Sequence, residues 1–182
     1  MGSQYFNLPN LLSFSRLVGT PALFWLARLP DQRWVAVCFA VLGLTDALDG
    51  HLARRWQQTS EFGSRLDGIA DLVFYPSGAL LLLWLFPQYL TPNFGYIGLT
   101  LLLLLAVNLY PRVRFGRFIL LHTHLARWSG VLAFVAVLGA FFTDTTLLIR
   151  LTALAYSLAF LEGLLIFHRR GPVSPDTRSL WS

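Results

Sequence analysis

Four aspartates stand close together in the sequence, at spacings that suit a helix. Asp46 and Asp49 are i,i+3 neighbours, and Asp67 and Asp71 are i,i+4 neighbours. Residues at these spacings lie on the same face of an α-helix, so each pair projects from one face. The polar link between the pairs, residues 55–61, is short. This pattern predicts two antiparallel neighbouring helices whose acidic faces can meet.

Carboxylates that face one another repel unless a cation lies between them. Long apolar runs flank both pairs, and a charged carboxylate inside a bilayer costs on the order of several kcal/mol. The cluster therefore needs a partner that offsets this cost. Oxygen ligands suit hard ions, so we expect Mg²⁺, with Mn²⁺ or Ca²⁺ as alternatives.

Small residues and an arginine accompany the aspartates. Gly50, Ala53 and Gly63 lie on or beside the acidic faces, where they let a bulky ligand or a second backbone approach closely. Arg54 lies about one helical turn beyond Asp49 and can hold a phosphate with its planar fork. Together these groups predict a diphosphate site, because proteins catalyse phosphoryl transfer mainly by positioning and charge stabilisation.

Residues 46–71 resemble the signature of the CDP-alcohol phosphotransferase family. The matching positions are Asp46-x-x-Asp49-Gly50-x-x-Ala53-Arg54, eight residues, and Gly63-x-x-x-Asp67-x-x-x-Asp71. The amino end is similar to that of phosphatidylglycerophosphate synthases. The resemblance implies an all-α membrane fold and an enzyme of phospholipid synthesis. In this reaction an acceptor alcohol attacks a CDP-alcohol, usually CDP-diacylglycerol, and CMP leaves.

The same resemblance implies roles for individual residues. Asp46, Asp49 and Asp67 would bind metal, while Asp71 would share a second Mg²⁺ or Mn²⁺ ion and act as the general base. Seven residues are candidates for the CDP-alcohol pocket: Asn10, Thr45, Gly50, Ala53, Arg54, Ser60 and Gly63. Ser60 has a second interpretation, because serine is also a preferred cap at the start of a helix.

The composition is that of an integral membrane protein. The chain has 182 residues, of which 55% are hydrophobic, and its mean hydropathy is +0.59. This length accommodates about six spanning helices. We expect one domain over residues 1–170 and a polar tail over 171–182. The spans are predicted at 11–29, 34–54, 62–87, 95–110, 126–142 and 147–167.

The segments between the spans have recognisable turn and charge signals. Residues 88–94 read as a loop, and Pro111 is expected to close the fourth span. Residues 112–125 form a basic connector that could be a short interfacial helix. Arg16 lies in the first span, where it is either an arginine reaching the membrane interface or a partner of the phosphate or metal site.

Arginine placement predicts the orientation. With the amino end in the cytoplasm, the cytoplasmic side holds Arg54, Arg55, Arg65, Arg112, Arg114, Arg117, Arg127, Arg169, Arg170 and Arg178, and the other side holds Arg28, Arg33 and Arg150. Basic residues favour the cytoplasmic side, so both termini and the aspartates are expected there. The setting would be a bacterial cell membrane. Orientation and lipid contact explain the net charge of +5, and no nucleic-acid partner is expected.

The acceptor alcohol is less specified. Arg112, Arg114, Arg117 and Arg127 are candidates for holding an acceptor phosphate, as in glycerol 3-phosphate or inositol phosphate. Their alternative role is contact with anionic lipid. Another polar alcohol is an alternative acceptor. The family resemblance also implies that the protein could form a homodimer.

Two other classes of protein use acidic residues in membranes. A Mg²⁺-dependent intramembrane prenyltransferase would need acidic motifs on widely separated helices, and a cation transporter would place them near mid-membrane. Here the aspartates form one cluster at one end of their helices, which favours the phosphotransferase.

Overall fold

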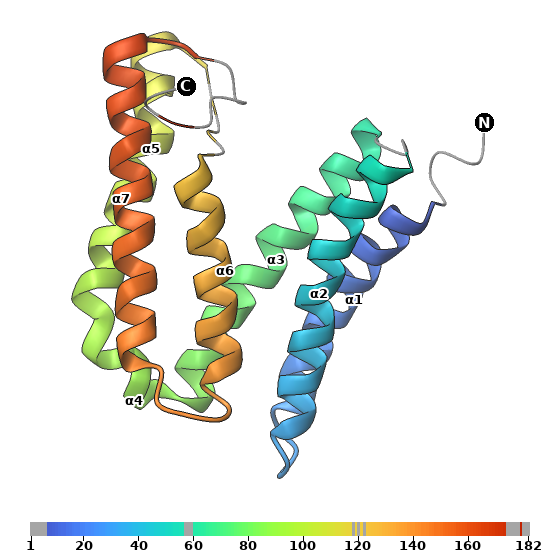
Figure 1. Cartoon of the computed structure of the whole chain (residues 1–182). Helices are drawn as coiled ribbons and strands as arrows, with labels where there is room; N and C mark the ends of the chain where they lie inside the picture. Colours follow the sequence, from blue (N-terminus) through green and yellow to red (C-terminus); the bar gives the residue numbers. More distant parts are fainter. Residues whose placement is uncertain are drawn as a thin grey trace. The chain divides into compact units, whose positions relative to one another are not determined.

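The structure, a computed structural model, describes residues 7–56, 60–117, 119, 121, 123–173 and 179, and at 47, 49–54, 61 and 64 it describes the backbone alone. The described part of the chain is helical and contains no strand. It divides into two packed units, each with its own helices (Figure 1). The amino-terminal unit is Met1–Phe86 with Ala140–Phe142, and the carboxy-terminal unit is Pro87–Gly139 with Thr143–Ser182. The prediction of one domain over 1–170 stays a prediction.

The amino-terminal unit contains α1 (Leu8–Leu26), α2 (Arg33–Arg55) and α3 (Glu61–Leu85). Helix α1 packs against both other helices, whereas α2 and α3 approach each other mainly through side chains. One such contact is the stacked ring pair Phe39–Phe74, with centroids 4.8 Å apart. The expectation that the acidic faces of α2 and α3 can meet is confirmed, because the Tyr75 hydroxyl of α3 also donates a hydrogen bond to Asp46 of α2. The sequence did not indicate that α1 contacts both helices.

Glycines allow α1 to approach both partners closely. A Cβ at Gly19 of α1 would stand 2.7 Å from a methyl group of Leu42 on α2, and one at Gly63 of α3 would stand 2.5 Å from Oδ1 of Asn10 on α1. Hydrogen in place of a side chain is what permits these backbones to pack together. The close packing places the polar face of α1 between the acidic helices.

Local side-chain contacts explain where several helices begin. The Asn7 side chain accepts a hydrogen bond of 2.9 Å from the Asn10 N–H at the start of α1, and the Ser60 hydroxyl accepts one of 3.0 Å from the Gly63 N–H at the start of α3. Both satisfy N–H groups that lack a partner within the helix. The capping role considered for Ser60 is thus present.

The carboxy-terminal unit contains α4 (Pro87–Leu90), the 3₁₀ turn η2 (Thr91–Asn93), α5 (Phe94–Phe115), α6 (His124–Gly139) and α7 (Thr146–Arg170). Helix α7 packs against both α5 and α6, and α5 and α7 run in the same direction (Figure 1). At the start of α7, the Asp144 carboxylate accepts a hydrogen bond of 2.7 Å from the Thr146 N–H. Hydrogen bonding by the Thr146 side chain, and then by its N–H, lowers the pKa of Asp144 below its usual value.

Buried polar groups join the elements of this unit. The fully buried Asn93 donates from its side-chain amide to the carbonyls of Tyr89 and Thr146, both at 2.9 Å. Its Oδ1 accepts from Nε of Arg150 at 3.2 Å, and the Arg150 guanidinium lies 5.1 Å from the centre of the Tyr96 ring. Asn93 therefore fixes η2 against α7.

Several predicted boundaries are wrong. Helix α1 is Leu8–Leu26 rather than 11–29, and α7 continues to Arg170 rather than ending at 167. Helix α5 continues through Pro111 to Phe115, where Gly116 ends it in the left-handed conformation at φ 73°. The missing N–H of proline removes one hydrogen bond without ending the helix, and Pro111 is buried among its neighbours. The predicted loop 88–94 is instead mostly α4 and η2, and α6 ends at Gly139 rather than 142. In the connector, residues 116, 117, 119, 121 and 123 are not helical.

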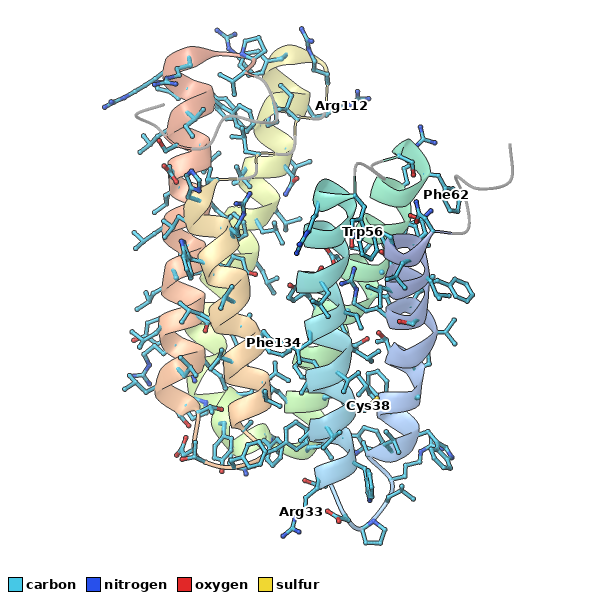
Figure 2. All side chains as sticks on the ribbon, turned by 45° about the vertical axis from the view of Figure 1, so that its right-hand side comes forward. Arg33, Cys38, Trp56, Phe62, Arg112 and Phe134 are labelled. Carbon is cyan, nitrogen blue, oxygen red and sulfur yellow. The ribbon has the colours of Figure 1, made fainter. Side chains whose placement is uncertain are left out.

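Many large apolar side chains along the helices are exposed, among the side chains drawn in Figure 2. Leu72 on α3, for example, is 74% exposed although it lies far from either helix end. Among the described residues, three segments are long and apolar enough to cross a bilayer, namely Arg65–Leu85, Pro87–Phe115 and Thr146–Arg170, and His124–Gly139 is a shorter apolar helix. Exposed leucine along such helices is typical of a surface in contact with lipid, and the chain is a membrane protein.

Candidate active site

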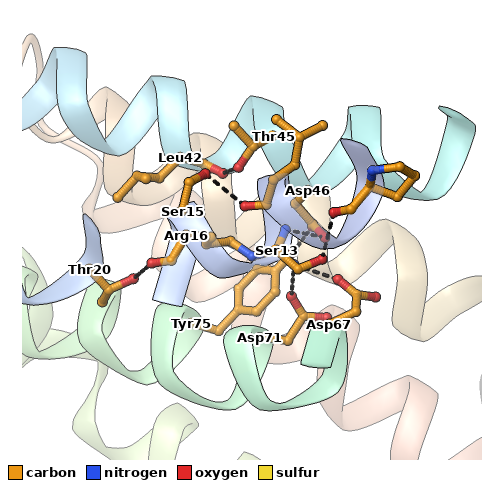
Figure 3. Close-up of polar contacts among 12 residues, drawn as sticks. Ser13, Ser15, Arg16, Thr20, Leu42, Thr45, Asp46, Asp67, Asp71 and Tyr75 are labelled. Carbon is orange, nitrogen blue, oxygen red and sulfur yellow. Dashed lines mark hydrogen bonds and ion pairs between the residues drawn. The ribbon is translucent and has the colours of Figure 1, made fainter. Parts of the chain in front are cut away.

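Three of the four predicted aspartates converge in the amino-terminal unit. Asp46 comes from α2, and Asp67 and Asp71 come from α3 (Figure 3). Each offers a carboxylate oxygen, and these oxygens all lie within 4.8 Å of one another. The helical spacing places Asp67 and Asp71 on one face of α3, as expected. The side chain of Asp49 lies outside the described part of the structure.

A buried arginine contacts all three carboxylates. Arg16 of α1 has an exposed fraction of 0%, and its Nη1 lies 2.7 Å from Oδ1 of Asp46. Its Nη2 lies 2.5 Å from Oδ1 of Asp67 and 3.3 Å from Oδ1 of Asp71. Of the two roles considered for Arg16, the structure places it at the acidic cluster and away from the surface.

Tyr75 is a further member of the cluster that the sequence interpretation missed. Its hydroxyl donates a hydrogen bond of 3.0 Å to Oδ2 of Asp46 (Figure 3). Tyr75 follows Asp71 by four residues on α3, so Asp67, Asp71 and Tyr75 form one stripe along the helix. Continuing the aspartate spacing by one more turn would have found it.

The aspartates are open to solvent while the arginine is not. The side chains of Asp46, Asp67 and Asp71 are 27%, 40% and 37% exposed. Arg16 therefore lies behind the carboxylates, and a ligand can approach them from the exposed side. Oxygen donors at this separation fit a hard divalent ion such as Mg²⁺ or Mn²⁺.

The predicted nucleotide-pocket residues have varied surroundings. Asn10 is buried on α1 beside Gly63. The Thr45 hydroxyl donates to the Leu42 carbonyl of its own helix at 2.6 Å. Ser60 caps α3 next to the cluster-bearing turns. Gly50, Ala53 and Arg54 lie in α2, and their side-chain surroundings are outside the described part of the structure.

The four acceptor candidates belong to the carboxy-terminal unit and are exposed. Arg112 and Arg114 are in the last turn of α5, Arg117 follows it, and Arg127 is near the start of α6. Arg112 also donates a hydrogen bond of 3.1 Å to the Gly116 carbonyl. This contact stabilises the end of its own helix, where a cation is favoured by the helix dipole. Figure 2 shows Arg112 at that end of the unit.

Comparison with known proteins identifies the family. The profile of the CDP-alcohol phosphatidyltransferase family matches residues 6–161, which include every member of the cluster. The chain belongs to this family. The resemblance seen in the sequence is thereby confirmed.

Individual relatives are similar over shorter stretches. A cardiolipin synthase (CMP-forming) of Streptomyces coelicolor is 39% identical over 93 residues, covering 47% of this chain and 43% of that protein. A CDP-diacylglycerol–glycerol-3-phosphate 3-phosphatidyltransferase of Escherichia coli K12 is 42% identical over 72 residues. This match covers 37% of this chain and 39% of that protein. The Haemophilus influenzae protein of the same name is 36% identical over 80 residues, which cover 42% of this chain and 43% of that protein. The matched stretch thus spans less than half the length of each relative.

Proposed function

We propose that this protein transfers the phosphatidyl group of CDP-diacylglycerol to glycerol 3-phosphate and releases CMP. The observation that carries the proposal is the convergence of Asp46, Asp67 and Asp71 within 4.8 Å, at the aspartate positions of the family signature. The glycerol 3-phosphate acceptor is supported by the names of the enterobacterial and Haemophilus relatives.

The proposed reaction is a substitution at phosphorus. The acceptor hydroxyl oxygen forms a bond to the phosphorus that carries the diacylglycerol, the bond from that phosphorus to the bridging oxygen breaks, and the bridging oxygen leaves with CMP. The hydroxyl proton passes to the Asp71 carboxylate. A base must lie within hydrogen-bond reach of the hydroxyl, and the 37% exposure of Asp71 allows a substrate to reach it.

The four aspartates, including Asp49, would hold one or two divalent ions. A bound ion would neutralise charge on the phosphoryl oxygens as the reaction proceeds. Arg16 lies behind Asp46, Asp67 and Asp71, and Tyr75 holds Asp46 by its second oxygen. Arg16 would thus hold the three carboxylates from their buried side, and Tyr75 would orient Asp46.

Asn10, Thr45, Gly50, Ala53, Arg54, Ser60 and Gly63 remain our candidates for the CDP-alcohol pocket. Arg112, Arg114, Arg117 and Arg127 remain candidates for the acceptor phosphate. We also keep the proposal of six membrane spans with both termini and the active site at the cytoplasmic side of a bacterial cell membrane, because the arginine distribution supports it.

A second acceptor is favoured by one specific observation. The Streptomyces coelicolor relative with a 93-residue match is named as a cardiolipin synthase that forms CMP. In that case the acceptor hydroxyl would belong to phosphatidylglycerol, and the chemistry at phosphorus would be unchanged. An acceptor with a terminal phosphate, such as glycerol 3-phosphate, would then have no part in the reaction.

CMP release distinguishes these acceptors. The purified full chain in detergent would receive CDP-diacylglycerol and Mg²⁺ with one acceptor at a time: glycerol 3-phosphate, phosphatidylglycerol, inositol phosphate, inositol or serine. We expect release that depends on glycerol 3-phosphate and stops when EDTA removes the metal. Release only with phosphatidylglycerol would support the second candidate, and activity that persists in EDTA would contradict the metal assignment.

A further inference from the structure

Arg16 is unusual because it is a completely buried cation surrounded by carboxylates from other helices. Its exposed fraction is 0%, and it reaches Asp46 on α2 as well as Asp67 and Asp71 on α3. The contact with Asp67 joins residues 51 positions apart in the chain. Arginine stays protonated at any pH a folded protein meets, so this is a permanent positive charge.

The charges of the cluster explain why a cation is needed there. Three carboxylates within 4.8 Å of one another repel strongly in surroundings less polar than water. The guanidinium offsets one of the three formal negative charges and attracts the others. The formal charge that remains on these four side chains is −2, before Asp49 is counted. A divalent ion would neutralise it.

The shape of the side chain matters as well as its charge. The two terminal nitrogens of Arg16 contact three separate carboxylates, all through their Oδ1 atoms. A planar fork can do this with several donors in fixed directions, whereas an ammonium group offers a single centre of charge. Each carboxylate has two oxygens that accept several bonds, so contact with Arg16 does not prevent metal binding.

We propose that Arg16 is a resident counter-cation of the acidic cluster: it keeps the cluster assembled in the metal-free protein, and it opposes metal binding by electrostatic repulsion. This inference rests on the proposed function for the presence of a divalent ion. It assigns to α1 a role that precedes substrate binding, because the acidic faces of α2 and α3 can then pack without the metal.

The inference predicts a coupling between Arg16 and the metal. In Arg16→Gln the carboxylates lose their internal counter-charge, so the metal-free protein should melt at a lower temperature than the wild type. An added divalent ion then replaces the missing charge and binds more tightly. A ligand that binds the folded state stabilises it more as its affinity rises.

The test measures the melting temperature of the purified full chain in detergent, with no nucleotide, in EDTA and across a Mg²⁺ titration. We expect the Mg²⁺-induced rise in melting temperature to be at least twofold larger in Arg16→Gln than in the wild type. Arg150→Gln is the matched control, because Arg150 contacts Asn93 and Tyr96 and lies in the other unit. The Mg²⁺-induced rise in melting temperature of Arg150→Gln should equal that of the wild type.

Other outcomes overturn the inference. An equal rise in Arg16→Gln and wild type would mean that Arg16 acts on the fold alone, and a smaller rise would mean that it assists metal binding. If no divalent ion shifts the wild-type melting temperature, the inference fails together with the metal assignment. Failure of the proposed reaction alone is separate, since it would appear as absent CMP release from a protein that still responds to Mg²⁺.

A second variant covers the case in which Arg16→Gln does not fold in EDTA. Arg16→Gln with Asp67→Asn removes one positive and one negative charge, and Asp67 has the shortest contact with Arg16. We expect the double variant to melt above Arg16→Gln in EDTA or, if the single variant is unfolded, to regain a folding transition. A double variant no more stable than the single one would show that lost packing, and not lost charge, explains the defect.

Discussion

At the scale of single residues, the three described aspartates differ in how they are held. Asp46 is contacted through both oxygens, by Arg16 at 2.7 Å and by Tyr75 at 3.0 Å. Asp71 has the longest of the three contacts with the guanidinium, at 3.3 Å. The proposed base role of Asp71 depends on its position in the cluster and on its 37% exposed side chain, which a substrate can reach.

Replacing Asp71 by Asn should reduce CMP release by roughly 10²- to 10⁴-fold, the usual contribution of a positioned general base. Asparagine keeps the shape but does not take up the proton, so the variant should stay folded and bind CDP-diacylglycerol. Turnover and lipid binding of the purified variant check both parts. Asp144→Asn, in the exposed turn before α7, should retain full activity. Unchanged turnover in Asp71→Asn would refute the base assignment.

Tyr75→Phe isolates the hydrogen bond to Asp46. The phenyl ring keeps its packing, and one hydrogen bond to a charged group is lost, worth about 1.5 kcal/mol. We expect kcat/KM to fall roughly tenfold and half-maximal activity to require more Mg²⁺. Tyr96→Phe in the other unit keeps its ring near Arg150 and should match the wild type. A Tyr75→Phe enzyme with unaltered Mg²⁺ dependence would show that the hydroxyl does not position Asp46.

At the scale of elements, the decisive feature is the place of α1. Gly19 faces Leu42 on one side and Asn10 faces Gly63 on the other, each so close that an added methyl group would overlap. Helix α1 thereby brings Arg16 to the carboxylates of both neighbours. The signature glycine at 63 has a packing role at this crossing besides its expected place in the nucleotide pocket.

Gly63→Ala should damage the crossing of α1 and α3. Its Cβ would stand 2.5 Å from Oδ1 of Asn10 and 3.1 Å from the Ser60 hydroxyl, and Asn10 is buried with little room to move. We expect a melting temperature lower by several degrees and a reduced rate of CMP release. Overpacking of this kind typically costs about 1–3 kcal/mol.

Gly68→Ala is the matched control on the same helix. A Cβ at Gly68 meets nothing within 4 Å, so the change should stabilise α3 by about 0.5–1 kcal/mol through lower chain entropy in the unfolded state. Thermal unfolding of the two variants side by side should show opposite signs. Equal losses in both would mean that the close contact with Asn10 has no energetic effect.

At the scale of the whole molecule, the arginines support one orientation. Within the carboxy-terminal unit, α5 and α7 run in the same direction (Figure 1), and their last turns carry Arg112, Arg114, Arg169 and Arg170. The turn at the other end, between α6 and α7, contains Asp144. This asymmetry within one unit is what the positive-inside rule describes for a helix bundle in a bilayer.

Thiol labelling tests that orientation. In a Cys38→Ser background, which removes the single native cysteine, cysteines would replace Arg117 or Asp144. A membrane-impermeant maleimide added to intact spheroplasts should label Asp144→Cys at once and Arg117→Cys only after permeabilisation. The reverse pattern would invert the proposed topology, and equal labelling of both would place the two segments on one side of the membrane.

Much of this architecture followed from local sequence patterns. The apolar runs predicted long helices at nearly their observed positions, and the i,i+3 and i,i+4 spacings predicted acidic faces. Such features depend on residues within a turn or two of one another, which periodicity reports directly. The misplaced end of α5 shows the limit of this reasoning. Proline is a strong local signal, but buried contacts and the Gly116 cap decide where that helix stops.

The sequence by itself determined the family, the acidic faces of two helices and the membrane setting, because each depends on residue types at short spacings. Only the tertiary structure decided that α1 packs against both acidic helices, that Arg16 is buried among their carboxylates, and that Tyr75 holds Asp46. The ion pair between Arg16 and Asp67 joins positions 51 residues apart. A contact of that range depends on how helices pack through their glycines, and no local periodicity encodes it.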